Sequence, residues 1–131
     1  MSDIESGLFA FLEANAGITA LVGTRIFPLR VPEGATLPAL VYHKISGPSA
    51  HSKDGDMSLN HPRYQFTVWA DKYADAKAVR TAVNAALNSF VNGSTMGGIV
   101  VDQIIAENDA DLHDPQTLEF GASIDATIWH H

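Results

Sequence analysis

Histidine is the side chain in this sequence best suited to metal binding, because a neutral imidazole is a common ligand of zinc and related ions. None of the six histidines forms an HxxxH or HExxH pair on an expected helix. Two of them fall in a segment rich in turn residues that nothing in the sequence rigidifies. The spacing therefore predicts no metal site. The histidines are His43, His51, His61, His113, His130 and His131, and the last two are either natural residues or the start of a purification tag.

Alternating carboxylates are the next candidates, since such pairs present oxygen ligands to calcium. Asp54 and Asp56 form one pair, and Asp109 and Asp111 form another. Neither pair is followed by the glycine at position six and the glutamate at position twelve of a calcium loop. Asp109, Asp111 and Asp114 could share a proton, but the surface hairpin expected there would keep them ionised. Both pairs are interpreted as solvated turns.

Nucleophilic and phosphate-binding motifs are missing from the sequence. Residues 93–98 are glycine-rich but lack the lysine of a phosphate-binding loop and precede an expected strand. No serine lies in a GxSxG elbow, and the absence of cysteine excludes a thiolate nucleophile, a disulfide and a thiolate zinc site. The sequence therefore predicts neither an enzyme nor a cofactor.

The composition indicates one packed domain spanning residues 1–131, with 46% hydrophobic and 18% charged residues. Fifteen acidic residues against eight scattered basic ones give a net charge of −7, which disfavours duplex DNA binding as the main activity. The acidic N-terminus lacks the pattern of a signal peptide, and no run approaches the ~18 apolar residues that span a bilayer. We expect a cytoplasmic protein with no membrane role.

Two amphipathic helices are predicted from hydrophobic spacing. The first begins near Ser2 and Glu5, which have capping-box spacing, and ends near residues 15–17, with a further short helical turn around residues 18–22. The second follows Asp71 and continues to Asn92. Its buried stripe includes Ala76, Val79, Val83, Ala86 and Phe90.

Strands are predicted at residues 39–45, 63–70, 99–106 and 120–129, with a short extended piece at 25–28. Residues 63–70 and 120–129 alternate in polarity, whereas residues 99–106 are apolar on both faces, as in a central strand. The predicted fold class is α+β, an antiparallel-dominated, mixed sheet of four to five strands with two helices packed on one face. The other face carries Trp69 and Trp129 and remains for loops or other subunits to cover.

Residues 46–62 form a long run of turn-favouring residues, from which we expect a mobile loop. Structureless loops of this length are uncommon in compact domains and are usually functional or disordered. The run is therefore a candidate contact element.

Five segments in register resemble the phage tail completion proteins, also called tail terminator or head–tail joining proteins, of long-tailed phages. Each segment alone is weakly specific, but together they cover nearly the whole chain. No catalytic motif belongs to the pattern. The segments are residues 21–28 (LVGTRIFP), residues 37–42 (LPALVY) with Ser46 and Gly47, residues 63–70 (RYQFTVWA), residues 73–76 (YADA) and residues 124–129 (IDATIW).

The resemblance implies a structural virion protein that forms a homo-oligomeric ring, usually of six copies, at the head-proximal end of the tail tube. Such a ring stops tube polymerisation and joins the tube to the head connector protein. The protein would be made in the host cytoplasm and end in the virion tail of a phage, a prophage or a gene-transfer particle. A closed ring needs two different complementary patches on each subunit.

Within this family, we expect contacts to a neighbouring subunit or the tube from two groups of residues. His51, Lys53 and Met57 belong to the expected loop, and the sheet-edge residues around Trp69 and Trp129 are expected to form the ring seam. Arg63 is a further candidate at the subunit or tube interface. Arg25, Arg30 and also Arg63 are candidates to line a lumen through which DNA passes with weak, non-specific contact. The alternatives are that the tryptophans pack locally under the loop and that the arginines are solvated or paired.

A different class of function stays open from the residues alone. The same fold class hosts small α/β ligand-binding and regulatory domains, and fold does not imply function. A ligand-binding domain would be monomeric or dimeric and stabilised by a metabolite, whereas a tail protein would form rings.

Overall fold

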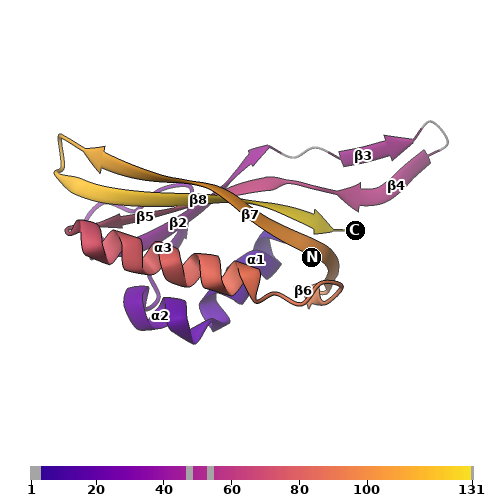
Figure 1. The fold of residues 1–131 in the computed structure, drawn as a ribbon, viewed down its shortest axis with the longest axis horizontal. Coiled ribbons are helices and arrows are strands. Elements are labelled where there is room, and N and C mark those ends of the chain that lie inside the picture. Colours follow the sequence, from indigo (N-terminus) through magenta and orange to yellow (C-terminus); the bar gives the residue numbers. More distant parts are fainter. Residues whose placement is uncertain (1–3, 47–48, 53–54, 131) are drawn as a thin grey trace.

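The computed structural model describes the backbone at residues 4–46, 49–52 and 55–130, and the side chains at residues 4–45 and 60–130. Its described helices are α1 (Ile4–Ala14), α2 (Ala16–Val22) and α3 (Tyr73–Asn88). All three lie on the same side of one sheet (Figure 1). The expected short turn after the first helix is the separate helix α2, which begins where the Asn15 side chain accepts a hydrogen bond from the backbone N–H of Ile18 at 3.1 Å.

The sheet is mixed but dominated by antiparallel pairs, so the α+β prediction is confirmed. The strand order is β1-β2-β5-β8, with β7 on the far side of β8 and β6 beside β7. Among the described strands, β1 and β2 are the one parallel pair. The sheet has eight strands, more than expected, because short strands add to the predicted ones. The strands are β1 (Ile26–Pro28), β2 (Ala39–Ser46), β3 (Ser49–Ser52), β4 (Gly55–Asn60), β5 (Arg63–Ala70), β6 (Thr95–Met96), β7 (Ile99–Asp114) and β8 (Glu119–His130).

The expected mobile loop at residues 46–62 is wrong, because its described residues include strands β3 and β4, which pair with each other and which we call the arm. The arm continues the pairing of β2 with β5 and extends beyond the helix-covered part of the sheet (Figure 1). At its base, Asn60 pairs with His130 in the same register as the β5–β8 ladder. The two strands could not be predicted from the turn-favouring composition. Their backbone N–H and C=O groups are satisfied by pairing with each other, which composition does not indicate.

Alternation along the strands packs one face of the sheet against the helices. Tyr64, Phe66 and Val68 of β5 are 1% exposed, and the partner residues on β8 are buried on the same side. The helices contribute stripes at the predicted spacing. Fully burying a side chain of this kind stabilises the fold by about 1.5–3 kcal/mol. The helix residues of this core include Leu8, Leu12, Ile18, Val22, Val79, Val83 and Leu87.

Gly7 sets the distance between α1 and the strand turn at β6. A Cβ atom at this position would lie 2.6 Å from the carbonyl carbon and oxygen of Met96. Only glycine permits so close an approach to another backbone. This contact holds α1 against β6.

The expected central position of residues 99–106 is wrong, because β7 lies outside β8 and continues to Asp114. β6 covers its outer side only at Ile99 and Val100. A register shift between Val101 and Gln103 changes which residues face the core. The strand therefore carries apolar residues on both faces although only one face is buried. Ile105, for example, is 40% exposed.

Candidate functional site

The sheet face opposite the helices, which we call the open face, carries both tryptophans. Trp69 pairs with Gly121 of β8, and Trp129 lies eight residues farther along the same strand. An even number of residues in a regular strand keeps side chains on one face, at about 3.4 Å per residue. The two rings therefore share the open face but lie ~27 Å apart, as two separate patches.

Trp69 lies in a shallow groove of about 320 Å³ on the open face. Gly121 makes room for the ring, since a Cβ atom there would lie 3.0 Å from Trp69 Cζ3. The groove has apolar walls and one charge of each sign, Arg30 and Glu119. It is lined by Leu29, Arg30, Val31, Val41, His43, Gln65, Thr67, Trp69, Leu112 and Glu119.

Trp129 lies at the other end of the open face, near the base of the arm. Its ring stacks on His61, with ring centroids 4.4 Å apart and an interplanar angle of 17°. On β7, its register partner is Gln103. This patch therefore joins the arm, β8 and the outer strand β7.

Arg63 and Asp125 form an ion pair on the open face, with 3.0 Å between Arg63 Nη2 and Asp125 Oδ2. The Asp125 side chain is 11% exposed and that of Arg63 is 32% exposed. Within the described residues, Arg63 Nε and Asp125 Oδ1 are buried and have no hydrogen-bond partner. The pair links β5 to β8, so Arg63 has a structural contact as well as its predicted interface role.

The other residues predicted from sequence are spread over the molecule. Arg25 donates from Nε to the carbonyl oxygen of Pro38 at 2.9 Å, and Arg30 is exposed at the rim of the groove. The backbone of His51 and Met57 belongs to the arm. Their side chains, and all of Lys53, lie outside the described residues.

A second polar cluster, which the sequence did not predict, ties α3 to β7. Asp111 accepts hydrogen bonds from the Tyr73 hydroxyl and from Arg80 Nη1, each at 2.7 Å. Arg80 Nη1 also donates to the carbonyl oxygen of Ala110 at 2.9 Å. The hydrogen bond from Tyr73, followed by that from Arg80, lowers the pKa of Asp111. The seven-residue spacing of Tyr73 and Arg80 on one helix was the signal available in the sequence.

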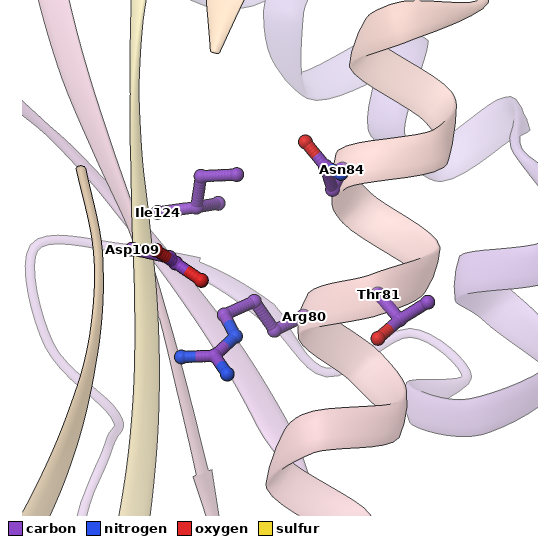
Figure 2. Close-up of a pocket in the computed structure, with 5 residues that line it drawn as sticks. All are labelled: Arg80, Thr81, Asn84, Asp109 and Ile124. Carbon is purple, nitrogen blue, oxygen red and sulfur yellow. The ribbon is translucent and has the colours of Figure 1, made fainter. Parts of the chain in front are cut away.

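Above this cluster is a small cavity of about 140 Å³ between α3 and the β7–β8 hairpin. Figure 2 shows Arg80 extending from the helix toward the strand that carries Asp109. Arg80 and Asp109 make the cavity polar, and Ile124 closes it from the sheet. Asp109 and Asp111 are thus strand residues beside a helix, and the expected turn at these two positions is wrong.

No group of three or more histidine, aspartate or glutamate side chains among the described residues is placed to hold a metal ion. No helix among residues 4–130 has the length and apolar character needed to cross a membrane.

Comparison with known families assigns the fold. The profile of the family described as tail completion protein gp17 matches residues 6–131. The chain belongs to this tail completion family. The resemblance found in the sequence is therefore confirmed, and the role of the family is a structural one in the phage tail.

Solved structures contain the same fold. This tail completion protein is similar to one chain in the structure described as "Virion of native gene transfer agent (GTA) particle", with 20% sequence identity and a TM-score of 0.70. The match covers 97% of this chain and 96% of that one. No curated protein matches.

Proposed function

We propose that this tail completion protein forms a ring of six copies at the head-proximal end of the tail tube. There it stops tube polymerisation and joins the tube to the head connector, as a structural component and not as an enzyme. The observation that carries the proposal is the family match over residues 6–131. A cyclic assembly needs two different patches on each subunit, which this fold provides.

The arm and the open face are the surfaces proposed for contact. The arm extends beyond the core, so its residues can reach a neighbouring subunit or the tube (Figure 1). Of the residues predicted to make this contact, His51 and Met57 have their backbone in the arm, and Lys53 lies outside the described residues. On the open face, Trp69 and Trp129 are half-buried aromatic side chains that none of the helices covers. Aromatic residues are enriched at protein interfaces, which supports a contact role for both patches.

The lumen is proposed to pass DNA without binding it tightly. Arg30 is exposed, and the Arg25 side chain donates a hydrogen bond from Nε to the carbonyl oxygen of Pro38. Isolated cations of this kind give weak, salt-sensitive attraction to phosphates. The net charge of −7 opposes tight binding, which suits a channel through which DNA must move.

The groove around Trp69 is the observation that favours the alternative of a small ligand-binding or regulatory domain. It joins an aromatic ring, apolar walls and two opposite charges in about 320 Å³. A ligand-binding role predicts a monomer or dimer whose stability rises with a metabolite. Family membership favours the tail role.

Light scattering of the purified protein, alone and with tail-tube protein, tests the ring. The expected result is a mass of about six chains, either free or only when tubes are present. Trp69→Ala and Trp129→Ala should then weaken assembly or tube capping, with Val91→Ala, an exposed apolar residue next to the β6 turn, as the control. A monomer or dimer that leaves tube length unchanged would contradict the proposal.

A further inference from the structure

The two edges of the sheet, at β2 and at β7, are both partly unpaired, and the unpaired stretches lie on the same row of register partners across the sheet. Across the sheet, Lys44 pairs with Tyr64, Tyr64 with Ala126, and Ala126 with Ala106. This row begins on β2 and ends on β7. Within the described strands, β1 covers β2 only at residues 40–42, and no strand pairs with the outer side of β7 at residues 103–107. Both ends of the row can therefore accept another strand.

Each unpaired edge also exposes a large apolar side chain. Ile45 is 45% exposed on β2, and Ile105 is 40% exposed on β7. Natural sheets usually protect long edges with charges, bulges or covering elements. Arg80 caps one carbonyl of β7 at Ala110, but that contact lies beyond residues 103–107. A register shift lies at Ile45, and residues 103–107 lie between two further shifts, so each isoleucine marks a short unpaired stretch of edge.

The two edges carry opposite charge. Residues 25–46, which include β1 and β2, have three basic residues and one acidic residue. Residues 99–119, which include all of β7, have six acidic residues and no lysine or arginine. Such complementarity between two surfaces of one chain favours contact between different edges and disfavours contact between like edges.

We propose that β7 of one copy pairs with β2 of the next copy, so that the sheet continues from subunit to subunit around the ring. Each step from β2 to β5, β8 and β7 is antiparallel, so β7 runs antiparallel to β2. A second copy set alongside in the same orientation continues this alternation. The contact is head-to-tail, which is the type that closes into a ring. It rests on the proposed ring and names the two patches that form its seam.

This seam brings Ile45 of one copy beside Ile105 of its neighbour. Trp129 lies on β8, the strand next to the acidic edge strand β7. Its register partner on β7 is Gln103, so it lies beside the seam. Trp69 lies ~27 Å away along β8 and is outside the seam. The seam therefore uses one of the two tryptophan patches and leaves the other for a different contact.

Disulfide cross-linking of the double variant Ile45→Cys/Ile105→Cys tests the seam in the full-length protein. The chain has no cysteine of its own. Within one copy the two positions are three strand spacings apart, or ~14 Å, which is beyond the ~7 Å limit for a disulfide. Any bridge between positions 45 and 105 must therefore join two copies. Oxidation of assembled protein should give a ladder of covalent dimers, trimers and higher species without reductant.

The controls separate the seam from the ring. Each single cysteine variant should stop at a dimer, and Ala85→Cys/Ile105→Cys, with one cysteine on the exposed side of α3, should give no ladder. Rings that are visible by electron microscopy but yield no ladder from the 45/105 variant would overturn the seam and leave the proposed function standing. Absence of rings, with and without tubes, would overturn both.

Discussion

Arg63 and Asp125 form an ion pair in which only the arginine reaches solvent appreciably. Removing one partner of a fully buried pair costs about 3–5 kcal/mol. Because Arg63 is 32% exposed, we expect Arg63→Ala to lower the free energy of unfolding by less, about 1–3 kcal/mol. Chemical denaturation at neutral pH measures this loss.

The double variant Arg63→Ala/Asp125→Ala should recover part of that stability, since it leaves no unpaired buried charge. Lys72→Ala, at an exposed lysine that makes no side-chain cap to α3, should change stability by less than ~0.5 kcal/mol. An Arg63→Ala protein as stable as the Lys72→Ala protein would show that the pair contributes nothing. In that case Arg63 would have no role in stability, and the proposed role in the lumen would remain.

Asp111 links stability to pH through its contacts with Tyr73 and Arg80. Its pKa is lowered from the ordinary value of 3.8, first by the hydrogen bond from Tyr73. A carboxyl with a lowered pKa in the folded state stabilises the fold above its unfolded pKa and loses this contribution as the pH falls through the folded pKa. Asp111→Asn should therefore be less stable than the parent near pH 6, and the difference should narrow toward about pH 2. Urea denaturation across this range, with Asp109→Asn as the comparison on the same strand, checks the trend; a constant difference would contradict it.

At the scale of elements, the arm is the part most separable from the core. β3 and β4 pair with each other, and the described contact to β8 is at the base, where Asn60 pairs with His130. Ser49 and Asn60 are register partners, so an Asn-Gly turn can replace residues 50–59 and close the shortened hairpin. We expect a thermal midpoint within ~4 °C of the parent but poorer control of tube length.

Electron microscopy of tubes polymerised with the shortened protein measures this effect. The variant Lys53→Asn/Asp54→Gly keeps the chain length between β3 and β4 and removes two charges, so it separates the loss of reach from the loss of charge. If the shortened protein caps tubes as well as the parent does, the arm is not a tube contact.

Elements with a clear hydrophobic period could be predicted from the sequence. α3 and β5 follow from their spacing alone, because each buries one regular stripe. The arm was missed because its strands are held by pairing with each other and carry little apolar signal of their own. The edge position of β7 was missed because a register shift near Asp102 makes both faces apolar. Local sequence carries no information on which strands become neighbours.

The candidate site shows the same limit. The shared face of Trp69 and Trp129 follows from alternation, but their separation depends on the register of β5 against β8. The stack of Trp129 on His61 joins residues 68 positions apart, and the Arg63–Asp125 pair joins residues 62 apart. Such contacts are set by the tertiary fold. The residues could be nominated from sequence, whereas their partners could not.

For the whole molecule, the separation of charge between the two sheet edges determines how copies meet. Lys44→Glu or Glu107→Lys places like charges along every β2–β7 seam of the proposed ring. We expect either variant to raise the concentration needed for assembly by roughly tenfold, in line with one lost charge interaction of about 1.4 kcal/mol across a partly desolvated contact. Light scattering across protein concentration, with tubes present, measures the midpoint.

The salt dependence of the two single variants provides the decisive comparison, because Lys44 and Glu107 lie on opposite faces of the continued sheet and act through the charge of their edges. Lys72→Glu, which makes the same charge change at an exposed position before α3, should leave the midpoint unchanged. Salt screens interactions between exposed charges, with a Debye length of ~8 Å at physiological ionic strength. The assembly defects of the single variants should therefore shrink as the salt concentration rises. Single variants that assemble like the parent at every salt concentration would mean that the charge of the two edges does not determine which edges meet.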